Sequence, residues 1–521
     1  MKDNRQRLGF ELGFAPDMDP LTPGVVTDCR NFIPTTRGMQ ALHAPVFVAG
    51  SVFDGPIFTT ERIIAYGFRA QSETFAQNAE YAATKDALYL RMDRYSNWVD
   101  ITSASKLYNS GFWTFTNFGT VMIGAEGGEV LQAPSPNVPY ALHTLPLIST
   151  GPTKATPIAG APTCCIVTSA ERFVLAFNGR GGDGDTWNCS ARDDHTSWTL
   201  SPATLAAQGR LVEPYGPITA ALPMGNDVIA YKSAGAVRGR FVPGDAEVWK
   251  WARLPVRIGA ASPRAACQLP DGRHAVMNAE SCWIFDGTQA VDVLAGKARD
   301  WFQLNAANTS YQYGGMATVY DGITNSVWFT FRQPNEVLAT YALVYHLSTG
   351  KLGLVALPAD LIVETGDIYG GYSTVRTPGY FESNTHRMLA FGNVTVSGGT
   401  ISTASAQGGP SYPVPVYITT GDTGDPFDLI DVTGVKLDFV RGNDATGTCG
   451  VQLLSRDTRD DASIANGTAE IKTATHIAGG DRYAARSSAH WHRARVLPGA
   501  GRMDLSGVWL RAATTKSERG G

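Results

Sequence analysis

The chain has 521 residues, with 43 Lys and Arg against 47 Asp and Glu, so its formal net charge is −4. This balance excludes a protein that grips nucleic acid through a broad basic surface, because such binding depends on neutralising many phosphates. Only 17% of the residues are charged, while 56 Gly and 29 Pro are spread along the chain. The composition favours short strands joined by tight turns and predicts an all-β fold.

Residues 1–45 are predicted to form an extended N-terminal segment. The opening MKDNRQRLGFELGF is polar and charged, and the chain has no run of about 18 apolar residues. We therefore expect no signal peptide and no stable membrane insertion. We expect synthesis in a cytoplasm.

The cysteines have irregular spacing and no CxxC pair, which is typical of reduced structural thiols. They are Cys29, Cys164, Cys165, Cys189, Cys267, Cys282 and Cys449.

A repeat of about fifty residues marks the range 46–395. Its first sign is the spacing of four tryptophans, which are separated by 100, 51 and 52 residues: Trp98, Trp198, Trp249 and Trp301. Segments that resemble pairs of strands begin at intervals of 53, 52, 46 and 52 residues, at Gly111, Cys164, Gly216, Ser262 and Gly314. Regular intervals of this length indicate a repeat architecture.

Each period contains short runs rich in aromatic and β-branched residues, such as RFVLAFNG and NSVWFTF, bounded by Gly, Asp and Asn. Four-stranded units of this length, which cannot bury both faces alone, are typical of β-propeller blades. We predict a β-propeller of about six or seven blades over 46–395, with the least regular blades in 46–150. A long meander or a pair of sandwiches with coincidental spacing remains the alternative.

The pattern changes after residue 395. Residues 396–410 are rich in Gly, Ser, Thr and Pro and are predicted to be a linker. Alternating strands without the fifty-residue spacing follow, and they predict an antiparallel β-sandwich over 411–514. Residues 515–521 are expected to fray.

The run DTWNCSARDDHTSWTLSP, residues 185–202, contains the acidic cluster Asp193-Asp194-His195. We interpret the cluster as a turn between two outer strands, Asp185–Ser190 and Ser197–Leu200, because Asp side chains accept backbone N–H bonds in turns. The alternative is a calcium site, for which Asp183 and Asp185 would supply further oxygens.

Other candidate sites are equally weak in the sequence. His490 and His492 would face one side of a strand, as zinc ligands do, but no third ligand has a recognisable spacing. The Cys164-Cys165 pair has no cationic neighbour that would activate a thiolate. No nucleophile, phosphate-loop or zinc-protease motif occurs, and no pair of carboxylates is selected for glycoside cleavage. We therefore predict no catalytic, cofactor-binding or metal site, and a protein that is not an enzyme.

Residues 17–45 resemble the opening of tail nozzle (tail tubular) proteins of short-tailed bacteriophages. In that family an Asn-Phe/Met-hydrophobic-Pro-Thr segment followed by Arg-Gly introduces a β-propeller. The residues that carry the signature here are Asn31, Phe32, Ile33, Pro34, Thr35, Arg37 and Gly38.

Three later segments are similar to elements of the same family, in the same order. The first matches through Trp187, Ser190, Asp194 and Trp198; the second through Gly259, Ser262, Pro263, Asp271, Gly272, Arg273, Phe285, Asp286 and Gly287; the third through Tyr320, Asp321, Asn325, Val327, Trp328, Tyr345 and Gly350. The resemblance covers most of residues 17–357. In the C-terminal part of the chain, a looser resemblance continues through the segments TGDTGDPFD and HWHRARV. Each motif is a turn or packing signature, and their order supplies the specificity.

The resemblance implies a structural virion protein in the phage tail. Such a nozzle subunit would form a ring with itself, six subunits around the axis, below the portal and adaptor complex. It would dock tail fibres or spikes, and DNA would pass through its channel without tight binding. The chain is shorter than some nozzle proteins, so elaborate fibre-docking domains are not expected.

The net charge fits a channel lined by polar and acidic groups, which would not hold phosphates. Two other functions remain open from the sequence. One is a β-propeller at a host-contacting tail tip that binds or cleaves carbohydrate through a central pocket. The other is a general interaction scaffold without a virion. A ring with a through-axis channel would distinguish the nozzle from both.

Overall fold

The structure is a computed structural model. It describes residues 4–42, 46–47, 63–69, 79–91, 98–103, 112–127, 142–146, 154–179, 183–245, 247–306, 315–334, 340–357, 359–365, 377–382, 388–390, 416–440, 449–459, 470–475, 482–498 and 504–515. Within these ranges the chain forms β-strands and one short helix, α1 (Arg299–Asn305), so the predicted all-β class is confirmed. The predicted linker 396–410 lies outside the described residues, as does nearly all of 515–521.

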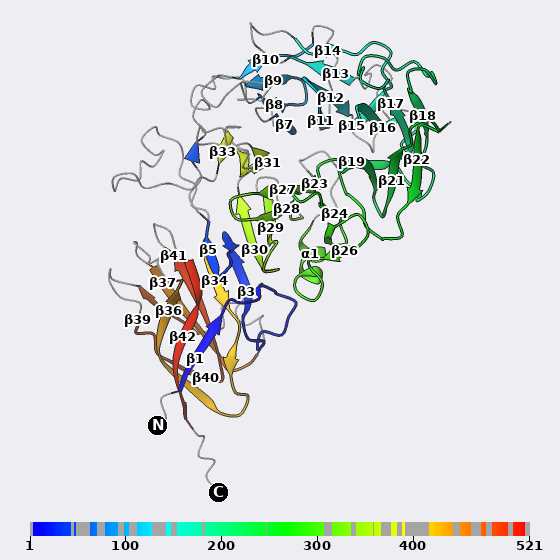
Figure 1. The fold of residues 1–521 in the computed structure, drawn as a ribbon. Helices are drawn as coiled ribbons and strands as arrows, with labels where there is room; N and C mark the ends of the chain where they lie inside the picture. The colour runs from blue at the N-terminus through cyan, green and yellow to red at the C-terminus, as the bar shows by residue number, and fades with distance from the viewer. Residues whose placement is uncertain are drawn as a thin grey trace.

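Six separate four-stranded antiparallel sheets occur in the described part of the chain (Figure 1). The first three are β7 (Ala65–Arg69), β8 (Ala79–Ala83), β9 (Leu88–Arg91), β10 (Val99–Asp100); β11 (Phe112–Phe118), β12 (Val121–Gly127), β13 (Leu142–Leu145), β14 (Thr156–Pro157); and β15 (Cys164–Ala170), β16 (Phe173–Gly179), β17 (Thr186–Cys189), β18 (Ala207–Arg210). The next three are β19 (Ile218–Met224), β20 (Asp227–Lys232), β21 (Gly235–Phe241), β22 (Trp249–Arg253); β23 (Ala266–Gln268), β24 (His274–Met277), β25 (Cys282–Phe285), β26 (Ala290–Asp292); and β31 (Ala359–Thr365), β32 (Thr377–Glu382), β33 (Met388–Ala390), β6 (Val46–Phe47).

The sheets are arranged as a β-propeller. The first strand of each sheet contacts the first strand of the next, in the order β7, β11, β15, β19, β23, then β27 (Ala317–Asp321) and β31, and β31 in turn contacts β7. Strand β6 is the outer strand of the last sheet, where Val46 pairs with Ala390 and Phe47 with Leu389. The predicted propeller is therefore confirmed, and its last sheet is completed by a strand from near the start of the chain.

Tight turns and aromatic packing build these sheets. Gly225, with φ of 61°, occupies the first position of the two-residue turn between Met224 and Asp227, where glycine is favoured because φ is positive. Between neighbouring sheets, aromatic residues form buried clusters, one of which contains Phe112, Phe177 and Trp249 from three different sheets. Burial of this apolar surface between sheets is the main favourable contribution to their association.

The tryptophan spacing has a structural basis at the outer edges of the sheets. Trp98 immediately precedes β10, and Trp249 begins β22; both side chains are buried beside outermost strands. Trp198 lies in the segment that leads to the outer strand β18, whereas Trp301 lies in α1. The regular spacing therefore marked the outer edge of three sheets.

A larger sheet joins the propeller to the two ends of the chain. It includes β27, β28 (Ser326–Phe331), β29 (Thr340–His346), β30 (Leu352–Leu357) and five N-terminal strands: β1 (Asn4–Gly9), β2 (Gly13–Phe14), β3 (Val25–Arg30), β4 (Phe32–Pro34), β5 (Met39–Ala41). Strand β30 pairs with β2 in parallel and with β4 in antiparallel orientation. Hydrogen bonds thus continue from the propeller into the N-terminal segment.

The C-terminal strands extend this sheet further. They are β34 (Tyr417–Thr420), β35 (Thr423–Gly424), β36 (Leu429–Phe439), β37 (Cys449–Arg456), β38 (Glu470–Thr475), β39 (Arg482–Tyr483), β40 (Ser487–Ala489), β41 (Trp491–Pro498) and β42 (Asp504–Thr515). Strand β1 pairs with β42, and β3 pairs with β34, so both termini lie at the end of the molecule opposite the propeller (Figure 1). The strands are antiparallel as predicted, but a separate sandwich is not confirmed, because the assigned sheet also contains β1–β5 and β27–β30.

Candidate functional site

The acidic run near residue 194 forms a turn in the structure. One carboxylate oxygen of Asp194 accepts hydrogen bonds from the backbone N–H (2.9 Å) and the hydroxyl (2.6 Å) of Thr196. These hydrogen bonds lower the pKa of Asp194. The indole N–H of Trp198 donates to the carbonyl of His195 at 2.9 Å and closes the turn.

One detail of the expected turn is wrong. Residues 197–200 are not a strand, and the partner of β17 is β18, with Cys189 opposite Ala207 and Thr186 opposite Arg210. The intervening segment instead forms a second turn, in which Ser201 bridges to Ala206 and Leu205 has a positive φ of 63°. The chain therefore makes two consecutive turns before the outer strand begins.

The tip of this run contacts two neighbouring hairpins. His195 lies against Phe118 of the β11–β12 hairpin, with 5.7 Å between ring centroids, and burial lowers the pKa of His195. Asp193, with φ of 67°, forms an ion pair with Arg172 in the β15–β16 turn, and its backbone N–H donates to the carbonyl of Arg172 at 2.8 Å. Asp193 and His195 therefore contact neighbouring hairpins, whereas Asp194 forms its hydrogen bonds within its own turn.

Other residues of the family-like motifs also have structural roles. The hydroxyl of Ser262 donates to the carbonyl of Met316 (2.5 Å) and accepts from the N–H of Ala265 (3.1 Å), which joins two adjacent sheets. Asp286 accepts the N–H groups of Thr288 and Gln289, both at 2.7 Å, and forms a turn. These motifs are conformational signatures, as the sequence suggested.

Asn31, the first residue of the N-terminal motif, fixes the connection to the propeller. Its side-chain oxygen accepts the N–H of Ala356 in β30 at 2.9 Å, and its own φ is 58°. A positive φ is tolerated better by Asn than by most other residues. The side chain of Asn31 is almost fully buried, so this hydrogen bond lies within the larger sheet.

Both ring nitrogens of His492 and one ring nitrogen of His490 have hydrogen-bonding partners. His492 is buried, with Nδ1 hydrogen-bonded to the hydroxyl of Ser455 (3.0 Å) and Nε2 to the carbonyl of Ile430 (2.7 Å). Burial lowers the pKa of His492. Nδ1 of His490 meets the carbonyl of Asp425 at 3.2 Å. In the residues that the structure describes, no group of three or more His, Cys, Asp or Glu side chains could hold a metal ion.

The carboxylates considered for calcium are paired with an arginine instead. The side chain of Arg210 donates to Asp185 at 2.7 Å and lies 3.6 Å from Asp183. The vicinal cysteines are buried, and burial raises the pKa of Cys164 to about 12 and that of Cys165 further. The two carboxylates are thus paired with a cation, and the two thiols are buried and protonated. Neither group has the environment of a metal-binding or reactive site.

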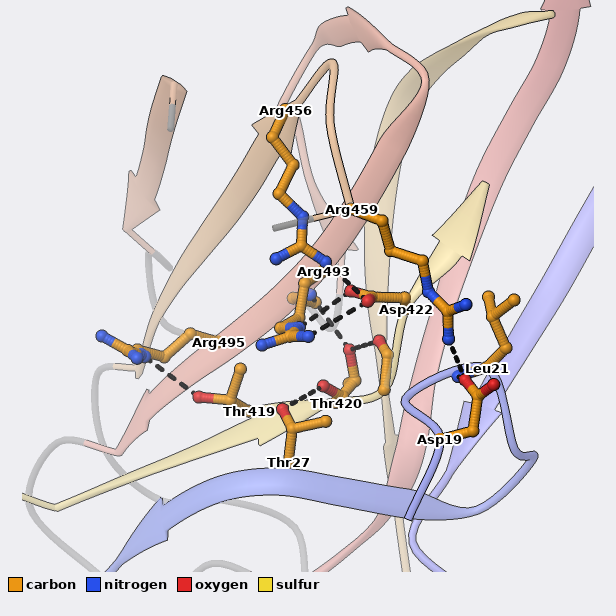
Figure 2. Close-up of polar contacts among 12 residues, drawn as sticks. Asp19, Leu21, Thr27, Thr419, Thr420, Asp422, Arg456, Arg459, Arg493 and Arg495 are labelled. Carbon is orange, nitrogen blue, oxygen red and sulfur yellow. Dashed lines mark hydrogen bonds and ion pairs between the residues drawn. The ribbon is translucent and has the colours of Figure 1, made fainter. Parts of the chain in front are cut away.

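A buried ionic cluster lies where the C-terminal strands meet the N-terminal segment (Figure 2). The carboxylate of Asp422 is fully buried and accepts hydrogen bonds from Nε (2.8 Å) and Nη2 (3.1 Å) of Arg493, while Nη2 of Arg456 approaches it at 2.5 Å. Charges removed from water in this way depend on their partners, because desolvation costs several kcal/mol for each ion. The sequence offered no signal for this cluster, since its members lie 34 and 37 residues apart in the chain.

Polar contacts continue from this cluster to the N-terminal segment. Thr27 donates to the carbonyl of Thr420 at 2.9 Å, and Arg459 forms an ion pair with Asp19 (Figure 2). Arg459 also lies over the ring of Trp491, 5.7 Å from its centroid. These contacts join the N-terminal segment to the C-terminal strands beside the Asp422 cluster.

Two loops with hydrogen-bonded backbone groups present large aromatic side chains to solvent. Tyr215 is 96% exposed in the loop between β18 and β19. The buried ammonium group of Lys232 donates to the carbonyls of Leu211 and Pro214, the latter at 2.5 Å, and holds this loop in place. Burial lowers the pKa of Lys232.

The second loop lies between β35 and β36. Phe427 is 83% exposed there, and the carboxylate of Asp425 accepts the N–H groups of Phe427 (2.7 Å) and Asp428 (3.2 Å). Exposed aromatic residues on loops with a bonded backbone are suited to interfaces, because aromatic side chains are enriched there and less loop order has to be gained on binding. Sequence reasoning missed both residues, since hydropathy does not tell which aromatic side chains point outward.

No family model and no curated protein matches the sequence. Similar solved structures include a functionally unknown protein from Desulfotomaculum acetoxidans DSM 771, with 10% identity and a TM-score of 0.33 over 56% of this chain and 84% of that chain. Another is a chain in the crystal structure of a mitotic checkpoint complex, with 8% identity and a TM-score of 0.36 over 67% of this chain and 95% of that chain. These scores are too low to carry a functional argument. No helix among the described residues is long and apolar enough to cross a membrane.

Proposed function

We propose that this protein is a structural subunit of the tail nozzle of a short-tailed bacteriophage. In this proposal it forms a ring with copies of itself below the portal and adaptor complex, docks tail fibres or spikes, and surrounds the DNA that leaves the capsid. The observation that carries the proposal is the ordered series of family-like motifs, from Asn31 to Gly350, in a chain that folds as a β-propeller. The protein acts in the virion tail and has no catalytic role.

The architecture supports a role that needs stiffness. Strands β30 and β2–β4 connect the propeller to the C-terminal strands through backbone hydrogen bonds. Side-chain contacts of Thr27 with Thr420 and of Asp19 with Arg459 reinforce the same junction. A conduit wall must keep its shape while DNA passes, and paired strands with buried polar partners resist bending between modules better than a flexible linker does.

We further propose a ring of seven blades. Strands β27–β30 form an antiparallel series like those of the six separate sheets, and β27 contacts the first strand on either side, β23 and β31. The first strands of the sheets contact one another in a closed circle that includes β27, which supports β27–β30 as a seventh blade. The outer strand of this blade, β30, also pairs with the N-terminal segment.

The C-terminal strands are proposed to form two layers of a β-sandwich. One network joins β1, β42, β36, β39 and β40, and the other joins β38, β37, β41, β34 and β3. Buried residues from both networks, including Val435 and Leu437 from the first and Val451 and Val496 from the second, belong to one hydrophobic cluster. Their shared burial supports face-to-face packing.

Electron microscopy of the purified full-length protein and of virions tests the nozzle proposal. We expect a closed ring with an axial channel, located between the portal and the fibres, and a channel wall lined by polar and acidic side chains. A protein that stays monomeric at micromolar concentration and binds or hydrolyses a host glycan would instead support the carbohydrate-directed propeller. A channel wall dense in Lys and Arg would contradict our explanation of the acidic net charge.

A further inference from the structure

The first five strands are paired with strands from the last third of the chain. We call residues 4–42, which contain β1–β5, the N-terminal strap. In the part of the chain that the structure describes, β1 and β5 pair with β42, β2 and β4 pair with β30, and β3 pairs with β34. These three partner strands all begin at Leu352 or later. The strap therefore depends on segments that are synthesised long after it.

Glycines mark the places where the strap crosses its partner strands. One glycine in or next to each partner strand faces a backbone carbonyl oxygen of the strap. A Cβ atom added at any of these glycines would lie closer than 3 Å to that oxygen, so the backbone would have to move. The pairs are Gly353 with Phe32, Gly421 with Pro20 and Gly507 with Leu8. The strap thus lies on a surface that is shaped for close approach of one backbone to another.

The strap shares its buried apolar side chains with only part of the core. Phe10, Phe14 and Phe32 are buried and belong to the cluster that also contains Val435 and Val496 of the C-terminal strands. Three other clusters pack the first four sheets, β7–β22, against one another, and they contain no described residue of the strap. Release of the strap would therefore leave these three clusters complete.

We propose that the N-terminal strap opens and closes as one unit while the first four sheets stay folded. Its opening costs less free energy than global unfolding, because the three clusters of those sheets remain intact. The open strap uncovers backbone edges of β30, β34 and β42, and unpaired strand edges pair readily with other chains. The closed strap covers these edges.

The order of the chain makes closure of the strap a mark of a complete protein. The strap is synthesised first, whereas its partner β42 ends only at Thr515. The strap therefore cannot complete its pairing until almost the whole chain is present. This inference does not depend on the nozzle proposal, because it uses contacts within one chain.

Two buried thiols of the full-length protein report on the opening. Cys29 lies in β3 of the strap, and Cys165 lies in one of the three clusters of the first four sheets. The protein is treated with iodoacetamide in urea below its unfolding midpoint, and each labelling rate is divided by the rate of the same thiol in the unfolded chain. We expect Cys29 to react about tenfold faster than Cys165 or more. Equal normalised rates would overturn the proposal, because only global unfolding would then expose both thiols.

Hydrogen exchange measured by mass spectrometry distinguishes a single unit from separate strands. Backbone amides of β1, β3 and β4 should exchange with the same dependence on urea, because one opening exposes all of them. Amides of β12 and β16 should exchange only with global unfolding. Different urea dependences for β1, β3 and β4 would show that the strands fray one by one, which contradicts a strap that moves as one unit.

The variant Gly421→Ala tests whether the close crossings hold the strap. The added methyl group crowds the carbonyl of Pro20, so labelling of Cys29 should become about tenfold faster while labelling of Cys165 is unchanged. Gly434→Ala in β36 is the matched control, since its methyl group would lie 3.5 Å from the nearest atom and should alter neither rate. An equal acceleration at both thiols in Gly421→Ala counts against a separate strap. If this variant does not fold, the two rates in the wild-type protein still decide the question.

Discussion

The carboxylate of Asp17 accepts a hydrogen bond from the backbone N–H of Trp301 at 3.0 Å and joins the N-terminal segment to α1. It also accepts the N–H of Asp300 at 2.7 Å, so two otherwise unpaired donors at the start of the helix are satisfied. Phe14 packs edge-on against the Trp301 ring, with 5.1 Å between centroids. A residue from the start of the chain therefore caps a helix almost 300 residues later.

Replacement of Asp17 by Ala should destabilise the protein by about 1 kcal/mol, the usual cost of a lost helix cap. Urea unfolding followed by tryptophan fluorescence measures the change. Asp300→Ala, which removes an exposed carboxylate on the same helix, is the control and should have less effect. An equal decrease in the free energy of unfolding in both variants would show that the Asp17 cap contributes nothing specific.

The buried Asp422 cluster should be far more sensitive than a surface ion pair. Asp422→Ala leaves two buried guanidinium groups without their shared carboxylate and should cost about 3–5 kcal/mol. Lys154→Ala breaks an ion pair with Asp100 in which both side chains are about half exposed, and should cost less than about 1 kcal/mol. Chemical denaturation of both variants gives the comparison, and a small effect of Asp422→Ala would show that the cluster is dispensable.

Stability should fall as the pH drops below 6.5, because His274 is buried in its neutral form. Its Nδ1 lies 2.8 Å from the hydroxyl of Tyr231 and its Nε2 lies 2.9 Å from the carbonyl of Pro223. Burial lowers the pKa of His274 to about 4, compared with 6.5 in the unfolded chain. The unfolded state therefore binds more protons between these values, and about 3 kcal/mol is lost from pH 6.5 to pH 4.

The free energy of unfolding measured at several pH values checks this dependence. His274→Gln should show a shallower slope between pH 6.5 and 4, even if it is less stable at pH 7. The other histidines are common to both proteins, so the difference in slope isolates His274. Identical slopes would mean that His274 titrates normally in the folded state.

The buried thiols should resist modification while the protein is folded. Burial raises the pKa of Cys29, Cys165 and Cys282 well above the ordinary value, so little thiolate forms at neutral pH. An aromatic disulfide reagent should react slowly with these groups in the native protein and rapidly in urea. Mass spectrometry of partly labelled protein identifies the reactive positions, and early labelling of Cys165 would contradict its burial.

Ring assembly should depend on the exposed Tyr215 if its loop is a subunit contact of the proposed nozzle. Tyr215→Ser should shift the protein from ring to monomer in light scattering without changing its melting temperature, because the side chain makes little contact within the chain. Leu304→Ser, at an 80% exposed position on α1, is the matched control. Unchanged assembly of Tyr215→Ser would exclude this loop from the interface.

The class of fold and much of the repeat follow from local features of the sequence. Gly, Asp and Asn between short apolar runs restrict the chain to tight turns and strands. Trp98 and Trp249 are both buried at outermost strands, so their spacing reflects the repeat of the sheets. The same local chemistry made Asp194 recognisable as a turn residue, because its hydrogen bonds span only two positions. Local effects of this kind can be read from neighbouring residues.

The pairing of distant segments, in contrast, is visible only in the folded chain. Strand β1 pairs with β42, and β6 pairs with β33, across hundreds of residues. The cluster of Asp422 with Arg456 and Arg493 likewise joins residues that lie tens of positions apart. A local pattern does not specify such partners, because backbone hydrogen bonds and apolar burial are favourable with any strand of compatible pattern. The choice is made by the packing of the whole chain, which satisfies its buried polar groups and apolar faces together.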